Sequence, residues 1–246
     1  MGFVDVTNPY NSRQVRRVSL LPEDVDVLVF WTRDPQNILA GAEELTKRGF
    51  RFYVMVTVTG YPPALEPDMV RATDALSAMK ELARKISPER VIWRYDPIFL
   101  SNVTGIEFHR ENFKILAQNL KDSSTRVIIS MYDKYRGSQK RLEGMERAGE
   151  LRLFEAGEGL TELLGHLAES AGEAGMEIQS CARKEDFSHY GIKPGACIDS
   201  GLITKLWGLE TKGKDKNQRP NCLCCQSVDI GNYGICPAGC VYCYAW

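Results

Sequence analysis

Short runs of β-branched and aromatic residues alternate along this chain with segments of helical periodicity, and this alternation limits the folds that the chain can adopt. Five runs have the length and apolar content of buried strands, at residues 25–31, 52–59, 91–94, 126–131 and 176–180. The segments between them place apolar residues at intervals of three and four, as amphipathic helices do. Strands separated by helices require a parallel sheet with right-handed crossovers. The sequence therefore predicts an α/β fold, a partial (β/α) TIM-like barrel with parallel strands.

Four helices are expected between these strands, at residues 35–48, 67–86, 104–121 and 159–174. The first begins with Pro35 and ends before Gly49, which are common residues at the start and the stop of a helix. The third opens with Thr104-Gly105-Ile106-Glu107, which has the form of a capping box. We also expect a glycine-interrupted helix within 132–150 and a further helix at 198–207.

Polar and aromatic residues follow each of the five predicted strands. These residues are 32–34, 59–61, 95–96, 132–133 and 181–183. In a (β/α) barrel, such positions share the mouth at the carboxyl ends of the strands, where substrates bind. Loops are polar in most proteins, so the pattern is compatible both with a plain surface and with a site for an unknown, small-molecule substrate.

The overall composition does not indicate nucleic acid or a membrane as a partner. The chain has 246 residues, of which 26% are charged, and its formal net charge is −1. This balance does not indicate a nucleic-acid partner. No apolar run approaches the roughly 20 residues that span a bilayer, and no signal peptide is visible. We therefore predict a cytoplasmic protein without a membrane partner.

The cysteines are unevenly distributed. All eight lie between Cys181 and Cys243, and the first 180 residues contain none. A long chain without an export signal does not need disulfides to fold, and the cytosol keeps thiols reduced. Clustered thiols in such a chain indicate metal binding or redox chemistry.

The last three cysteines have a restrictive spacing. Cys236, Cys240 and Cys243 form the pattern C-x3-C-x-aromatic-C. Three thiolates on so short a loop can bind three irons of a [4Fe–4S] cluster. The fourth iron then has no protein ligand, and the amino and carboxylate groups of S-adenosylmethionine (SAM) can occupy its open position. We therefore predict a division into a partial barrel, residues 1–180, and a cysteine-rich iron–sulfur segment, residues 181–246, packed on the barrel mouth.

This motif resembles that of the radical SAM enzymes. The resemblance implies that Cys236, Cys240 and Cys243 bind the cluster and that Tyr242 contacts the adenine of SAM. It also implies that an electron donor such as ferredoxin or flavodoxin reduces the cluster. SAM would then be cleaved to a 5′-deoxyadenosyl radical that takes hydrogen from a substrate. In that superfamily the motif normally follows the first strand, whereas here it closes the chain.

A closer resemblance covers nearly the whole chain. The sequence is similar to a bacterial and archaeal family recorded as a domain of unknown function, noted for radical-SAM-like cysteines at its C-terminus. The matching stretches are residues 8–11, 29–35, 57–61, 91–97, 195–199, 217–219, 227–231 and 240–245. Family members usually begin with an extra strand and continue beyond the last stretch, so this chain is expected to be either a fragment or a gene model that starts late. Ala238 stands where the family has a histidine.

The same resemblance implies a second cluster. Cys181, Cys197, Cys222 and Cys224 fall where the family keeps cysteines. Four thiolates would complete a cluster with no open iron, able to relay electrons or bind substrate. Cys225 is then left over.

Two alternatives to radical chemistry stay open. The first is an iron–sulfur protein that transfers electrons and never cleaves SAM. The second is a zinc ribbon on a barrel, because Cys222-x2-Cys225 and Cys240-x2-Cys243 are separated by 14 residues and tetrahedral zinc takes four thiolates. Cys236 and Cys224 have no role in that arrangement.

Arg94 and Asp96 lie at the end of the third predicted strand, where they point the same way if the strand continues. A buried ion pair that shapes the barrel mouth is one interpretation. Binding of the SAM carboxylate or of a substrate anion is the other, because a guanidinium recognises a carboxylate through two hydrogen bonds. The histidines His109 and His166 are expected on helix faces.

Overall fold

The structure is a computed structural model that describes residues 2–8, 11–155, 157, 159–231 and 234–243. All the cysteines lie within this part of the chain. Residues 9–10 and 244–245, which belong to two of the family-like stretches, lie outside the described residues.

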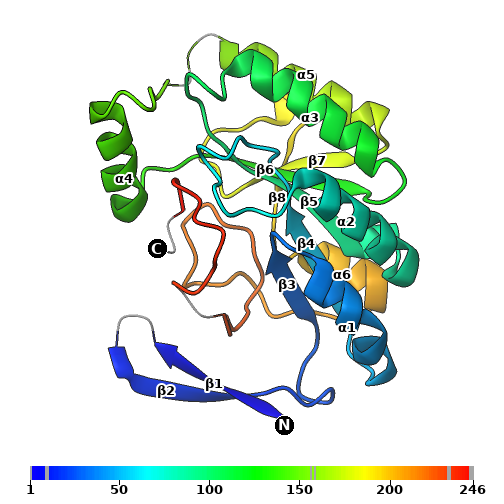
Figure 1. Ribbon diagram of the computed structural model, residues 1–246. Coiled ribbons are helices and arrows are strands. Elements are labelled where there is room, and N and C mark those ends of the chain that lie inside the picture. The colour runs from blue at the N-terminus through cyan, green and yellow to red at the C-terminus, as the bar shows by residue number, and fades with distance from the viewer. Residues whose placement is uncertain (1, 9–10, 156, 158, 232–233, 244–246) are drawn as a thin grey trace.

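Six parallel strands form one sheet and follow each other in chain order (Figure 1). They are β3 (Leu28–Thr32), β4 (Phe52–Thr57), β5 (Val91–Ile98), β6 (Arg126–Met131), β7 (Glu177–Cys181) and β8 (Lys193–Gly195). This sequential order is that of a (β/α) barrel. Within the described residues β3 and β8 are the two edges of the sheet, so the barrel is open. The predicted α/β fold with parallel strands is confirmed. The short β8 was not predicted, because Pro194 weakens the strand signal.

Four helices cover one face of the sheet (Figure 1). They are α1 (Gln36–Lys47), α2 (Ala72–Ile86), α3 (Ile106–Leu120) and α5 (Gly159–Glu173). Alternate strand residues such as Val54, Trp93 and Ile129 are fully or almost fully buried against them. These alternate positions point to the same side because side chains of a strand have a period of two. Two short 3-10 helices, η1 (Pro88–Arg90) and η2 (Ser188–Tyr190), complete the connections.

A different set of residues covers the opposite face, which we call the inner face. Tyr53, Ile92 and Ile128 point to it and pack against α6 (Ser200–Trp207) and the cysteine segment. Asp199 caps α6, because its carboxylate accepts hydrogen bonds from the backbone of residues 201 and 202. Both faces of the parallel sheet are therefore covered, as this type of sheet requires.

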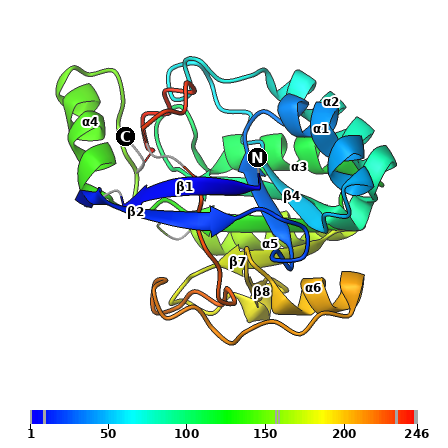
Figure 2. The same cartoon turned by 90° about the horizontal axis from the view of Figure 1, so that it is seen from below.

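Helix α4 (Arg136–Arg147) stands apart from the other helices and lies beside the C-terminal tail (Figures 1 and 2). Its Leu142 and Met145 pack in the same apolar cluster as Cys240 and Tyr242. The helix expected within 132–150 is thus confirmed, and its apolar side is directed at the tail.

An antiparallel hairpin at the start of the chain was not predicted. Strands β1 (Phe3–Asn8) and β2 (Asn11–Ser19) form a two-stranded sheet of their own (Figure 2). Arg17 pairs with Asp5 at 2.8 Å and lies over the ring of Phe3. The signal in the sequence was the alternation of Val4 and Val6 with the polar Asp5 and Thr7, which matches the alternating burial of β1 in the structure.

Two helix starts differ from the prediction. The capping box at 104–107 is wrong, because Gly105 is the N-cap and the Thr104 hydroxyl donates instead to the Phe99 carbonyl at 2.6 Å. Helix α2 begins at Ala72 rather than near residue 67. Residues 67 and 68 form a turn instead, in which the Met69 N–H donates to the Glu66 carbonyl at 3.4 Å.

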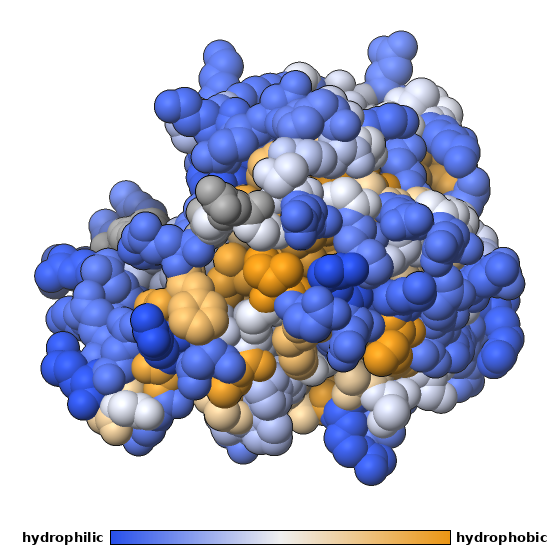
Figure 3. Space-filling model, turned by 90° about the horizontal axis from the view of Figure 1, so that it is seen from above, coloured by the Kyte–Doolittle hydropathy of each residue, from blue (hydrophilic) through white to orange (hydrophobic). Residues whose placement is uncertain are grey.

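The face seen in Figure 3 is mainly hydrophilic, with hydrophobic side chains gathered near its centre. Among the described residues, no helix is both long and apolar enough to cross a membrane.

His109 is buried inside the molecule on α3, whereas the sequence indicated only a helix face. Its Nδ1 lies 2.8 Å from the Tyr95 hydroxyl and its Nε2 lies 3.2 Å from the Phe99 carbonyl oxygen. Burial lowers the pKa of His109 from 6.5 to about 4. The folded protein therefore keeps this imidazole neutral under conditions in which the unfolded chain protonates it.

This difference predicts a loss of stability in acid. Because the folded pKa is lower, the contribution of His109 is complete above pH 6.5 and is lost as the pH falls towards about 4. The loss should reach about 3 kcal/mol. Urea unfolding near neutral pH and near pH 4 would measure it. His109→Gln should be less stable at neutral pH but should show a smaller decline with acid; an equal decline would contradict this account.

Candidate functional site

The C-terminal tail lies over the carboxyl ends of β3, β4 and β5, where backbone hydrogen bonds hold it from two sides. The Val241 N–H donates to the Leu65 carbonyl at 3.0 Å. Arg141 of α4 donates to the carbonyls of Val241, at 3.1 Å, and of Cys243. A turn within the loop joins the Cys243 N–H to the Cys240 carbonyl at 3.0 Å. These contacts hold the loop of three cysteines at the carboxyl edge of the sheet.

Gly239 allows the loop to approach the body of the protein closely. Its φ is +62°, a left-handed conformation that glycine adopts without strain. A Cβ at this position would lie 3.2 Å from Pro67 Cγ and 3.3 Å from Asp68 Oδ2. A side chain at residue 239 would therefore push the loop away from the segment that precedes α2.

A buried polar network fixes the other end of the loop. Arg33, which follows β3, forms an ion pair with Glu66 at 2.7 Å and donates to the Tyr242 hydroxyl at 2.8 Å. Tyr242 in turn donates to the same carboxylate. Thr59 completes the set with a bond of 2.6 Å to Glu66 Oε1. Because Glu66 and Tyr242 are almost inaccessible to solvent, each group depends on the others for its hydrogen bonds.

Tyr242 therefore has a structural role that the sequence did not indicate. Its ring packs against Tyr61 and Phe99, with centroids 5.8 and 5.6 Å away. Burial raises the pKa of Tyr242 well above its ordinary value, so the phenol keeps the proton that it donates to Glu66. Its contact with adenine stays a prediction.

The three thiols of the loop differ in exposure. Cys236 is exposed, Cys243 is intermediate and Cys240 is buried. Burial raises the pKa of Cys240 to about 11, while the nearby charge of Arg33 opposes this rise. Cys240 and Cys243 belong to the same apolar cluster as Tyr242.

The second predicted set of cysteines comes together on the inner face. The sulfur atoms of Cys181 and Cys197 are 3.6 Å apart. The Cys224 thiol interacts with those of Cys197 and Cys222. All four are buried. The set thus joins the end of β7, the loop before α6 and the segment that follows residue 221.

The inner face of the sheet positions this second set. The Tyr53 hydroxyl donates to the Cys197 carbonyl at 2.6 Å and accepts from the Asp199 N–H at 3.3 Å. The Ile198 N–H donates to the Cys224 sulfur at 3.3 Å. The pKa of Cys181 lies below its ordinary value, because Cys197 donates a hydrogen bond to it and Arg94 adds a positive charge nearby.

Asp96, at the end of β5, lies between the two sets of cysteines. Its carboxylate pairs with Arg94 and accepts from Ser130 on β6. Its backbone carbonyl faces Arg33, at 3.5 Å from Nη2. Arg94 and Asp96 are both about four-fifths buried, so the ion pair predicted at the mouth is present. Their role in binding the SAM carboxylate or a substrate anion stays a prediction.

The sequence did not identify several residues of this region. Asp133 bridges Arg183, at 3.3 Å, and Arg219, at 2.8 Å. Arg219 also acts electrostatically on Cys181. Glu66 was missed because it follows no strand and no motif marks it. Asp133 and Arg183 were visible only as polar residues after strands, and the distant Arg219 lies in a loop that looked like plain surface.

The cysteines of the zinc-ribbon alternative are not brought together. Cys222 and Cys225 belong to the inner-face cluster, whereas Cys240 and Cys243 belong to the cluster around Tyr242. In the part of the chain that the structure describes, no three His, Cys, Asp or Glu side chains are placed to hold a single metal ion. A cubane cluster does not need that arrangement, because each thiolate binds a different iron.

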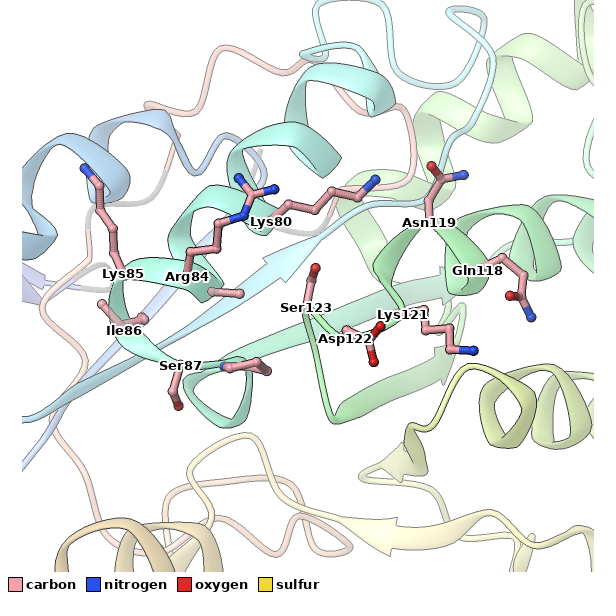
Figure 4. Close-up of a pocket in the computed structure, with 12 residues that line it drawn as sticks. Lys80, Arg84, Lys85, Ile86, Ser87, Gln118, Asn119, Lys121, Asp122 and Ser123 are labelled. Carbon is pink, nitrogen blue, oxygen red and sulfur yellow. The ribbon is translucent and has the colours of Figure 1, made fainter.

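Two hollows lie among the described residues, of which one adjoins the candidate site and the other does not. A cavity of about 270 Å³ adjoins the buried network, and Arg33, Thr59, Tyr61 and Glu66 are among its lining residues. A wider hollow, about 1060 Å³, lies between the ends of α2 and α3 (Figure 4). It is lined by basic side chains such as Lys80 and lies at the amino ends of β5 and β6, so it is not part of the candidate site.

Comparison with known proteins relates this chain to one family. A family model described as "Domain of unknown function (DUF1848)" matches residues 1–245. No curated protein matches the chain.

The close approach at Gly239 leads to a prediction for the metal-free protein. Gly239→Ala should loosen the loop, because both the left-handed backbone and the contacts with Pro67 and Asp68 oppose a Cβ. The cost should be about 2 kcal/mol, and alkylation of the buried Cys240 should become faster, as mass spectrometry can measure.

Gly234 provides the matched control. Its φ is +74°, but a Cβ there would meet no atom within 4 Å. Gly234→Ala should therefore have only the backbone cost, about 1 kcal/mol, and a smaller effect on Cys240. Equal effects of the two substitutions would show that the close approach is unimportant.

Proposed function

The chain belongs to the DUF1848 family, and from this premise we propose that it is an iron–sulfur protein of the radical SAM type that acts on a substrate not yet known. Cys236, Cys240 and Cys243 hold a [4Fe–4S] cluster with one open iron in this proposal. Cys181, Cys197, Cys222 and Cys224 hold a second cluster with all its irons ligated.

One observation carries this proposal: two separate groups of thiols lie at the carboxyl edge and inner face of the same parallel sheet. Parallel (β/α) sheets bind substrates at that edge. Asp96 contacts the surroundings of both groups, through its carboxylate and through its backbone carbonyl. Seven thiols in such a place are a donor set that suits iron–sulfur clusters.

The loop of Cys236, Cys240 and Cys243 suits a cluster with one open iron. It offers three thiols and no fourth, and Cys236 is accessible to solvent, so that one side of the loop is open. When bound, such a cluster supplies the electron that cleaves SAM reductively. The protein's own residues hold the loop in place: Arg141 binds its carbonyls, and Arg33 and Glu66 fix Tyr242.

The adjoining cavity is the candidate place for the organic ligand. Its volume of about 270 Å³ is close to the lower limit of small-molecule sites, about 300 Å³. Arg33 and Glu66 line it next to the loop, and Tyr61 and Met69 give it apolar walls. It can therefore hold part of SAM or of a substrate away from water.

Metal and sulfide analysis after anaerobic purification tests this proposal. We expect about eight irons and eight sulfides per chain for two clusters, with broad absorption in the violet. Cys236→Ala and Cys181→Ala should each lower the iron content to about four. Cys225→Ala is the matched control, because it removes a buried thiol of the same segment and should leave iron unchanged. Stoichiometric zinc without sulfide would overturn the proposal.

Product analysis separates the enzyme from an electron carrier. With dithionite and SAM, the wild-type protein should form 5′-deoxyadenosine, and Cys236→Ala should form none. Clusters without any 5′-deoxyadenosine would favour the electron-transfer protein instead.

A further inference from the structure

Arg33 and Glu66 form a buried ion pair next to the loop of three cysteines. The two side chains are 18% and 3% exposed, and their N–O distance is 2.7 Å. Removing two charges from water costs free energy, and apolar residues of similar size are often at least as stabilising. The pair therefore has a feature that two apolar residues would lack, which is a strong local electric field.

The pair contacts the cysteine loop through Tyr242, which lies between Cys240 and Cys243 in the chain. Arg33 donates to the Tyr242 hydroxyl at 2.8 Å, and its guanidinium carbon lies 5.8 Å from the centre of the Tyr242 ring. Tyr242 and Thr59 hydrogen-bond to the pair and hold the carboxylate in place. The pair is thus a dipole that is held in a fixed position beside the cysteine loop.

We propose that the Arg33–Glu66 pair sets the reduction potential of the cluster held by Cys236, Cys240 and Cys243. The inference rests on the proposed function. One electron passes from a reduced donor of the ferredoxin or flavodoxin class to the cluster, so that the donor is oxidised and the cluster gains one negative charge. The positive charge of Arg33 stabilises this added charge and makes reduction easier, and the negative charge of Glu66 opposes it. Arg33 is a positioning residue in this role, because it acts through its charge and is not one of the residues that hold the cluster.

Three variants test the sign of the effect. Arg33→Gln removes the positive end and should lower the potential of the first cluster. Glu66→Gln removes the negative end and should raise it. The double variant should lie between them, near the wild-type value. We expect each single change to alter the equilibrium constant for reduction about tenfold, which is about 59 mV for one electron. Redox titration followed by electron paramagnetic resonance would measure it.

Two controls separate this effect from a structural disturbance. The second cluster, near Cys181, lies beside another ion pair and should keep its potential in all three variants. Lys80→Gln removes a positive charge from the hollow at the far end of the sheet (Figure 4) and should change neither potential. A disturbance of the fold would instead lower iron content or move both potentials together.

The outcomes distinguish the two proposals. If the wild-type protein holds no cluster, the proposed function fails. If clusters are present but both single variants shift the first potential in the same direction, or not at all, the inference fails and the proposed function stands. If Arg33→Gln loses its iron, Arg33→Lys replaces it: the retained charge should keep the wild-type potential, while Glu66→Gln should still raise it, and any other result overturns the inference.

Discussion

The buried contact between Arg33, Glu66 and Tyr242 is the interaction on which the candidate site depends most. The tail contains no helix or strand among its described residues, so no regular hydrogen-bond ladder holds it. Tyr242 instead packs its ring against Tyr61 and Phe99 and donates a hydrogen bond to Glu66. If the Tyr242 side chain left this site, Arg33 and Glu66 would each lose a buried hydrogen-bond partner. The loop of three cysteines is therefore held over the strand ends by a few strong contacts.

The two faces of the sheet pack against different parts of the chain. The outer face, with Val54 and Trp93, packs against helices and supplies most of the apolar core. The inner face carries Tyr53, Arg94 and the second cysteine set, and α6 covers it. Since successive strand residues alternate between faces, the same short strands provide both stability and site. The cysteine-rich segment is packed on the inner face and the mouth alike, so it is not an independent appendage.

The two cysteine sets share neighbours at the end of β5. Asp96 reaches Arg33 through its backbone and Arg94 through its side chain, so the same strand end contacts the neighbours of both sets. Such an arrangement suits a second cluster that passes electrons or holds a substrate near the first. A closed barrel fills its interior with side chains. Here the cysteine segment covers the inner face instead, so the sheet stays open without exposing that face to water.

The sequence by itself determined the α/β class, five of the six parallel strands, most of the helices and the eight cysteines, because periodicity and spacing are local properties. It also placed Arg94 and Asp96 on one side of a strand, which the ion pair bears out. Only the tertiary structure decided that Cys222 and Cys225 lie away from Cys240, and that Glu66 meets Tyr242 across 176 positions of sequence. Contacts between such distant residues arise from the way the strands and loops pack, and no local pattern records them.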